Sequence, residues 1–170
     1  HSINLSDHLP LDEYEKEFYR LRNEDLNFSN QPGNLTKSLK FGYRVKHGLE
    51  RNKVFDSYHA IVTDIMKNGL KEHYQNNSRF DNSIFYFDTW GNILPKYGYN
   101  TTHLHPGCEW SCILYVKNVK SARTIFHDIR PMQIDYSEWH DNIDHFGNEL
   151  VVDGDDGDLL IFPSYLRHSV

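Results

Sequence analysis

The 170-residue sequence predicts a mainly β protein in which two N-terminal helices pack on a β-sandwich of jelly-roll type. Apolar residues recur at helical spacing in two stretches before Asn77. After Asn77, short runs rich in Ile, Phe, Tyr, Val and Trp alternate with Gly, Asn, Asp and Pro. A hydrophobic content of 38% in a chain of this length is enough for one core. We therefore expect a single domain over residues 1–170, helical over 1–77 and jelly-roll over 78–170.

The two expected helices lie on either side of a polar segment. The first runs from Leu11 to Arg22, with Tyr14, Phe18 and Leu21 on its apolar face. Residues 23–40 are polar and predict a loop. The second runs from about Glu50 to Tyr74, and we interpret its continuous apolar stripe as core packing. That stripe consists of Val54, Phe55, Tyr58, Ile61, Val62, Ile65, Met66 and Leu70.

Six short strands are expected in the C-terminal half. A closed jelly roll needs at least one more strand, which we expect beyond Val170. The acidic run from Asp153 to Asp158 predicts a tight turn before a strand, because its glycines lack a following glutamate at the position that a calcium loop requires. The expected strands are Ser83–Trp90, Thr101–His105, Trp110–Val116, Arg123–His127, Leu150–Asp153 and Asp158–Pro163.

Charge and cysteine content narrow the class of protein. The net charge of −6, without a run of Lys or Arg, argues against binding to a nucleic-acid backbone. No apolar run approaches the roughly 20 residues needed to cross a bilayer, and no signal peptide is visible. The two cysteines, Cys108 and Cys112, have neither a redox nor a zinc spacing. We interpret them as free thiols in a reducing compartment and expect a cytoplasmic location.

The pair His103-Leu104-His105 is the candidate metal site. Residues two apart on a strand face the same way, so two imidazoles could bind one divalent first-row metal. The pair alone is weak evidence, because eleven histidines in 170 residues would produce a little under one H-x-H pair by chance. His168, near the end of the sequence, is the candidate third ligand. Three histidines without a metal remain the alternative, and we interpret the polar cluster from His140 to His145 as a solvated loop.

Five motifs in the last 80 or so residues resemble the iron(II)/2-oxoglutarate-dependent oxygenase superfamily, and within it small bacterial and phage members. The matching pieces cover a W-x-N entry, an H-x-H-P segment, a Y-V strand end, an F-x-D-x-R-P strand and an F-P-S-x-L-x-H-S-V end. In this sequence they are Trp90–Asn92, Tyr99–Pro106, Tyr115–Val116, Phe126–Pro131 and Gly157–Val170.

The resemblance implies a double-stranded β-helix, the cupin-like form of the jelly roll, with His103, His105 and His168 as catalytic iron ligands. It also implies that Asn92 and Tyr115 bind 2-oxoglutarate, and that an Arg or Lys follows the distal histidine, here beyond the end of the sequence. The usual facial triad has a carboxylate in second place, where this sequence has histidine. Whether His105 or the nearby Glu109 completes the set stays open.

The function that the resemblance implies is that of an Fe(II)- and 2-oxoglutarate-dependent dioxygenase. Such an enzyme would use O2 to hydroxylate a substrate that the sequence does not identify, releasing succinate and CO2. The first alternative is a cupin-like metal-binding protein or isomerase using His103, His105, Glu109 and His168 without 2-oxoglutarate. The second is a jelly-roll interaction module without metal. We expect neither a membrane nor a nucleic-acid partner, and a homodimer stays open.

Overall fold

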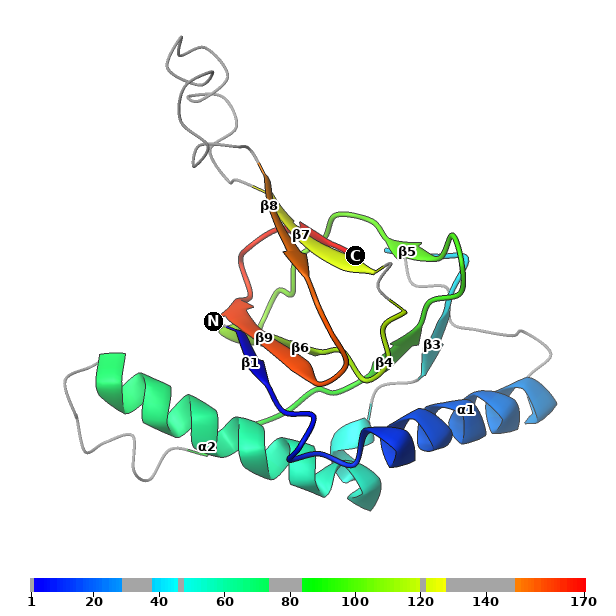
Figure 1. The fold of residues 1–170 in the computed structure, drawn as a ribbon, viewed down its shortest axis with the longest axis horizontal. Helices are drawn as coiled ribbons and strands as arrows, with labels where there is room; N and C mark the ends of the chain where they lie inside the picture. Colours follow the sequence, from blue (N-terminus) through cyan, green and yellow to red (C-terminus); the bar gives the residue numbers. More distant parts are fainter. Residues whose placement is uncertain (1, 29–37, 46–47, 74–83, 120–121, 128–148) are drawn as a thin grey trace, which may run out of the picture.

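Two helices run along one side of a group of short antiparallel strands in the computed structural model of the chain (Figure 1). The structure describes residues 2–28, 38–45, 48–73, 84–119, 122–127 and 149–170. Within these ranges no helix is both long and apolar enough to cross a membrane. The helices are α1 (Leu11–Phe28) and α2 (Asp56–His73), preceded by the 3-10 turns η1 (Leu49–Arg51) and η2 (Lys53–Phe55). The strands are β1 (Ser2–Asn4), β2 (Leu39–Lys40), β3 (Tyr43–Val45), β4 (Gly91–Ile93), β5 (Tyr99–Asn100), β6 (Trp110–Leu114), β7 (Arg123–His127), β8 (Glu149–Asp153), β9 (Asp158–Pro163) and β10 (His168–Ser169).

Both predicted helices are present, with different boundaries. Helix α1 begins at Leu11 as expected but continues to Phe28, into the segment predicted as a loop. Helix α2 begins at Asp56 and not near Glu50. The reason is local: the Asn52 side chain accepts the Val54 N–H at 3.1 Å, which closes a 3-10 turn and delays the helix.

The described strands form two three-stranded and two two-stranded antiparallel sheets. One three-stranded sheet has the order β1-β9-β6 and the other β10-β7-β8. The pairs β2-β5 and β3-β4 complete the set and join the N-terminal half of the chain to the C-terminal half. Figure 1 shows both three-stranded sheets on the same side of α1 and α2. This mainly β arrangement with two helices is consistent with a β-sandwich.

Four predicted strands are confirmed as β6, β7, β8 and β9, and two were wrong. Residues 84–90 have no regular secondary structure, and Ser83 lies outside the described residues. Thr101–His105 is irregular apart from one bridge at His103, because its backbone N–H groups donate to three separate segments. Those of Thr101, His103 and His105 reach the carbonyl groups of Ser38, His168 and Ser164.

The strands that sequence patterns missed are short. β1, β2, β3, β4, β5 and β10 have two or three residues each, too few for an alternation pattern to show. The predicted turn after Asp153 is confirmed, since β8 ends there and β9 begins at Asp158. Gly157 has a φ of +88° in this turn, and a Cβ there would lie 2.6 Å from the Ser6 nitrogen.

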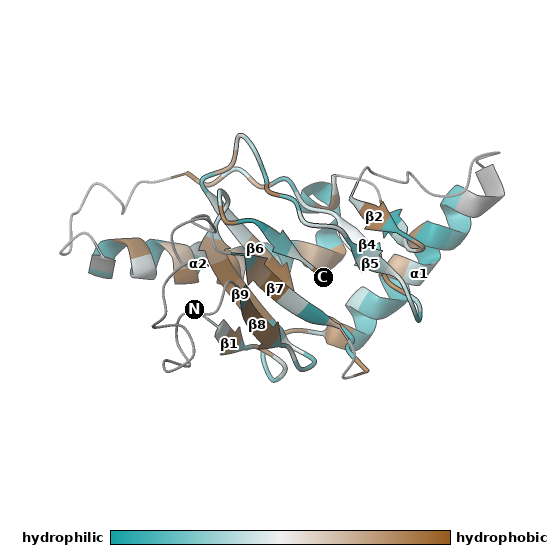
Figure 2. Cartoon of the chain, turned by 90° about the horizontal axis from the view of Figure 1, so that it is seen from above, coloured by the Kyte–Doolittle hydropathy of each residue, from teal (hydrophilic) through white to brown (hydrophobic). Residues whose placement is uncertain are grey.

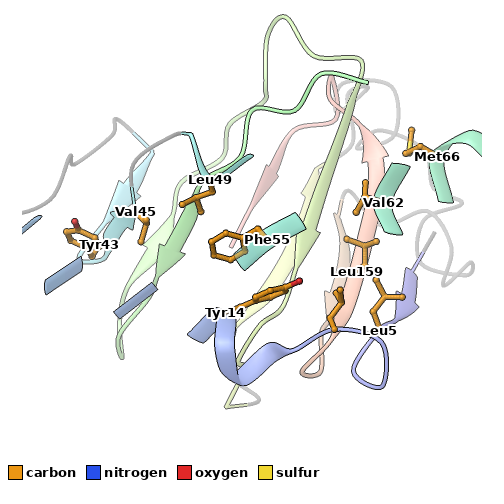
Figure 3. Packing of buried hydrophobic residues seen from close by; sticks show 10 residues of the cluster. Leu5, Tyr14, Tyr43, Val45, Leu49, Phe55, Val62, Met66 and Leu159 are labelled. Atoms are coloured by element: carbon orange, nitrogen blue, oxygen red, sulfur yellow. The ribbon is translucent and has the colours of Figure 1, made fainter. Parts of the chain in front are cut away.

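Strand β9 is buried on both faces and separates two apolar clusters. Leu159 is fully buried in the larger cluster, which fills the space between the helices and the sheet (Figure 3). Leu160 and Phe162 alternate with it and belong to the smaller cluster, together with Tyr115. Figure 2 shows the corresponding apolar colouring of β9. The rest of the larger cluster is Leu5, Leu9, Tyr14, Tyr43, Val45, Leu49, Phe55, Val62 and Met66.

Truncating Leu159 should test whether this core holds the helices to the sheet. Leu159→Ala should lower the free energy of unfolding by about 2–5 kcal/mol, because the cavity lies between two tightly packed layers. Leu150→Ala is the matched control, since Leu150 on β8 is 63% exposed, and it should cost less than about 1 kcal/mol. Urea unfolding followed by circular dichroism measures both. Equal losses for the two variants would contradict this assignment of the core.

Candidate metal centre

Backbone pairing brings the three predicted histidines together. The His103 N–H donates to the His168 carbonyl at 2.9 Å, and the His168 N–H donates back to His103 at 3.0 Å. The His105 N–H donates to the Ser164 carbonyl at 3.2 Å. One ligand nitrogen from each of the three histidines lies within 4.8 Å of the others. Within the described ranges, no other group of three or more potential ligands converges in this way.

Hydrogen bonds to carbonyl groups set the tautomers of two of these imidazoles. His103 Nδ1 lies 2.7 Å from the Thr101 carbonyl oxygen, and His168 Nδ1 lies 3.0 Å from that of Leu166. Because a carbonyl oxygen only accepts, each Nδ1 carries the proton and each Nε2 keeps a lone pair. The main chain therefore orients both rings with a metal-binding nitrogen available.

The three side chains suit a divalent first-row metal. Burial lowers the pKa of all three imidazoles, and that of His105 falls to about 4, helped by the neighbouring His168 and His103. All three are therefore neutral at pH 7, the form that ligates metal. The Nε2 atoms of His105 and His168 are 3.3 Å apart. Two nitrogens bound side by side to one ion at about 2.1 Å would be about 3.0 Å apart, so the spacing of this pair is close to that of two ligands on one ion.

The carboxylate of Glu109 does not belong to this converging group. Glu109 is exposed, and its backbone carbonyl accepts the Ser164 N–H at 3.0 Å. The arrangement thus favours His105 over Glu109 as the third member of the set, and it lacks the fourth ligand of the cupin-like alternative. The polar cluster from His140 to His145, interpreted from sequence as a loop, lies outside the described residues.

Asn92 lies in β4 beside a residue that the sequence prediction missed. Its Oδ1 accepts from Arg44 Nε at 3.1 Å across the β3-β4 pair. Arg44 is only 8% exposed, and its guanidinium lies 5.4 Å from the centre of the Trp90 ring. The Trp90 ring in turn lies 5.2 Å from that of His105. A charged residue between the apolar Tyr43 and Val45 was the signal available in the sequence.

Tyr115 follows β6 and lies in the smaller apolar cluster. Its hydroxyl is 2.6 Å from Thr124 Oγ1, and both residues are buried. Its ring packs so closely on Gly154 that a Cβ there would lie 2.3 Å away. Phe162 connects this cluster to the histidines, with its ring 4.9 Å from that of His168. The predicted role of Tyr115 toward a co-substrate stays a prediction.

His127 joins the two segments that carry His103 and His168, and the sequence prediction did not assign it a role. Its Nε2 lies 3.2 Å from Thr102 Oγ1 and 3.0 Å from Ser169 Oγ. Its Nδ1 lies 3.1 Å from a Glu149 carboxylate oxygen on β8. Because the carboxylate only accepts, Nδ1 donates to it, which fixes the imidazole ring between the two hydroxyl groups. Thr102 and Ser169 each adjoin a candidate ligand in the chain.

Removing His127 should therefore weaken metal binding. His127→Ala should lower the affinity for Co(II) or Zn(II) by on the order of tenfold, because the two ligand-bearing segments lose their shared hydrogen-bond partner. Competition with a chromogenic chelator measures the affinity. His8→Ala, at an exposed histidine, is the control and should leave it unchanged. An unaltered affinity in His127→Ala would show that backbone pairing alone positions the ligands.

The lowered pKa values of the three histidines predict how the stability of the metal-free protein depends on pH. The unfolded chain, with histidine pKa values near 6.5, takes up protons before the folded chain does. Stability should thus be complete above about pH 6.5 and decrease as the pH falls toward 4, where His105 itself titrates. Urea midpoints near pH 7 and pH 5, with a chelator present, measure the decrease. It should be smaller in His105→Gln than in the wild type, and an equal decrease would contradict the prediction.

A protein-family model matches the C-terminal half of the chain. Residues 88–170, just under half of the chain, match the family described as "Putative 2OG-Fe(II) oxygenase". This range contains the three converging histidines as well as Asn92 and Tyr115, whereas Arg44 lies outside it. No curated protein matches the chain significantly. This match supports the resemblance of residues 88–170 to the 2OG-Fe(II) oxygenase superfamily that the motifs of this segment predicted.

Proposed function

We propose that this protein is an Fe(II)- and 2-oxoglutarate-dependent dioxygenase that hydroxylates its substrate and releases succinate and CO2. The family implies an oxygenase of this class, together with Fe(II) and 2-oxoglutarate. The observation that carries the proposal is the convergence of three neutral imidazoles inside the matched segment. We propose the same three residues, His103, His105 and His168, as the iron ligands and catalytic residues.

The chain's own side chains would hold and orient the reactants. When bound, iron and 2-oxoglutarate supply oxidation of a substrate C–H bond by O2, coupled to decarboxylation of the co-substrate. Three protein ligands leave positions on a six-coordinate ion for small molecules. The family motifs support Asn92 and Tyr115 as co-substrate contacts, and these remain part of the proposal.

Aromatic rings would shelter the metal centre from water. Trp90 lies against His105, while Phe162 and Phe126 lie 4.9 and 6.1 Å from His168, measured between ring centres. Excluding water strengthens the electrostatic interactions inside a site and limits side reactions. The strand pairing around these rings supports a double-stranded β-helix as the proposed fold. The two free cysteines agree with the cytoplasmic location we propose.

The proposal is tested by iron-dependent turnover of 2-oxoglutarate. Purified protein with Fe(II) and ascorbate should form succinate, and His103→Ala and His168→Ala should each reduce the rate at least about 100-fold, because each removes a metal ligand. Succinate is measured by mass spectrometry, and metal content by elemental analysis of each variant.

Glu109→Gln is the matched control for these variants. It should retain both metal and turnover, because Glu109 lies outside the converging group. If the wild type binds metal tightly but forms no succinate, and Glu109→Gln weakens the binding, the cupin-like alternative would replace the proposal. If the wild type holds no metal after reconstitution, only the interaction module would remain.

A further inference from the structure

Three exposed aromatic residues lie on two neighbouring turns, and none of them belongs to either apolar cluster. Phe41 is in the turn between β2 and β3, Tyr97 is in the turn between β4 and β5, and Tyr99 begins β5. Their exposed fractions are 75%, 79% and 44%. The Phe41 and Tyr99 ring centres are 6.3 Å apart, and the rings are tilted by 50°, so they are not stacked face to face. We call these three residues the aromatic platform.

Two residues of the aromatic platform have strained backbone conformations. Phe41 has a φ of 53° and Tyr97 a φ of 72°, and among the residues that the structure describes they are the only non-glycine residues with a positive φ. This left-handed region is unfavourable for any residue with a Cβ, and more so for a bulky one. Because both rings are exposed, burial does not offset the cost. Strain of this kind is typical of residues that contact a ligand.

The two turns hold the aromatic platform in one arrangement. Strand β2 pairs with β5, where Lys40 lies directly opposite Tyr99, and β3 pairs with β4. The Gly98 N–H donates to the Pro95 carbonyl at 2.7 Å, which closes the second turn. The turns are so close that a Cβ at Gly98 would lie 3.1 Å from the Phe41 carbonyl oxygen. A ligand would therefore meet rings that are already positioned.

Each turn also carries an exposed lysine beside its rings. Lys40 precedes Phe41 and faces the same side of the sheet as Tyr99, because the two residues are directly opposite each other. Lys96 Nζ lies 5.0 Å from the centre of the Tyr97 ring. In the part of the chain that the structure describes, no ion pair includes either lysine. Both ammonium groups are thus available to an anionic partner.

The negative charge of the chain is distributed unevenly. The chain has 24 Asp and Glu residues, but neither residues 38–49 nor residues 89–108 contain one. These two ranges include both turns and the four strands that they connect. The net charge of −6, which argues against a nucleic-acid partner for the chain as a whole, therefore does not describe this surface.

Single-stranded nucleic acid has the chemistry that this surface suits. Its phosphates alternate with bases, and every base has a face that stacks on an aromatic ring. The bases of a duplex are already stacked on one another, so single strands offer more of these faces. Anionic membranes also attract basic residues, but such recognition uses clusters of four or more, and Lys40 and Lys96 provide fewer.

We propose that the aromatic platform, together with Lys40 and Lys96, binds single-stranded nucleic acid by base stacking and phosphate contacts. This inference is independent of iron and 2-oxoglutarate, because none of these residues belongs to the converging histidine group. Binding should depend on salt. Two phosphate contacts predict a slope of about −1.4 when the logarithm of the affinity is plotted against that of the salt concentration.

The test measures fluorescence anisotropy of a labelled oligothymidylate of about 12 nucleotides, without added metal. The wild type should bind it more tightly than a duplex of the same length. Phe41→Gly and Tyr97→Gly should each weaken binding about 10-fold, because each removes a stacking partner. Their urea midpoints should stay equal or rise, because glycine adopts a positive φ without strain. A purely structural role for these rings would lower the midpoints instead.

Substitution of the lysines tests the phosphate contacts. Lys40→Gln and Lys96→Gln should each bring the salt slope about 0.7 closer to zero, because each removes one phosphate contact. Tyr19→Ala and Lys16→Gln are the matched controls on α1, at an aromatic side chain that is 43% exposed and at an exposed lysine. Both should keep the wild-type affinity and slope.

Three results would overturn the inference. The first is the absence of oligonucleotide binding by the wild type, and the second is binding that depends on the lysines but not on the rings. The third is capture by phosphatidylserine vesicles without oligonucleotide binding, lost in the glycine variants, which would assign the surface to a membrane. A wild type that forms no succinate but still binds the oligonucleotide through the rings would overturn the proposed function alone.

Discussion

The metal centre depends on one antiparallel bridge, formed by two backbone hydrogen bonds between His103 and His168. This bridge joins an irregular segment to the start of β10, whose pairing with β7 holds it in the β10-β7-β8 sheet. The ring orientations follow from it, because the carbonyl acceptors of both Nδ1 atoms belong to the same two segments. His127 adds side-chain hydrogen bonds on either side of the bridge.

Electrostatics sets this centre apart from a triad of two histidines and a carboxylate. The three imidazoles, of which His168 is buried and the other two half-buried, have lowered pKa values and bring no negative charge. The charge of Arg44 lowers the pKa of His105, and the Asp88 carboxylate acts in the opposite direction. Such a site is most stable when its remaining ligands are anions, since a buried charge needs a partner.

The N-terminal half of the chain is part of the structure that supports the site. Strand β1 pairs with β9, and Leu159 on that strand packs against the helices. The opposite face of β9 presents Phe162 to His168. Strand β3 places Arg44 next to Asn92 through its pairing with β4. A segment outside the matched family range therefore contributes both core packing and a charged group to the centre.

The sequence by itself determined the helices, four of the strands and the identity of the three converging histidines. The helices and strands depend on local periodicity, and the histidines were identified by the H-x-H spacing together with the family motifs around it. The sequence did not show that Thr101–His105 is irregular, that Glu109 stays outside the site, or that Arg44 and His127 adjoin it. Those features come from pairing between segments tens of residues apart and from strands of two or three residues. Neither leaves a periodic pattern, so the tertiary structure alone decided them.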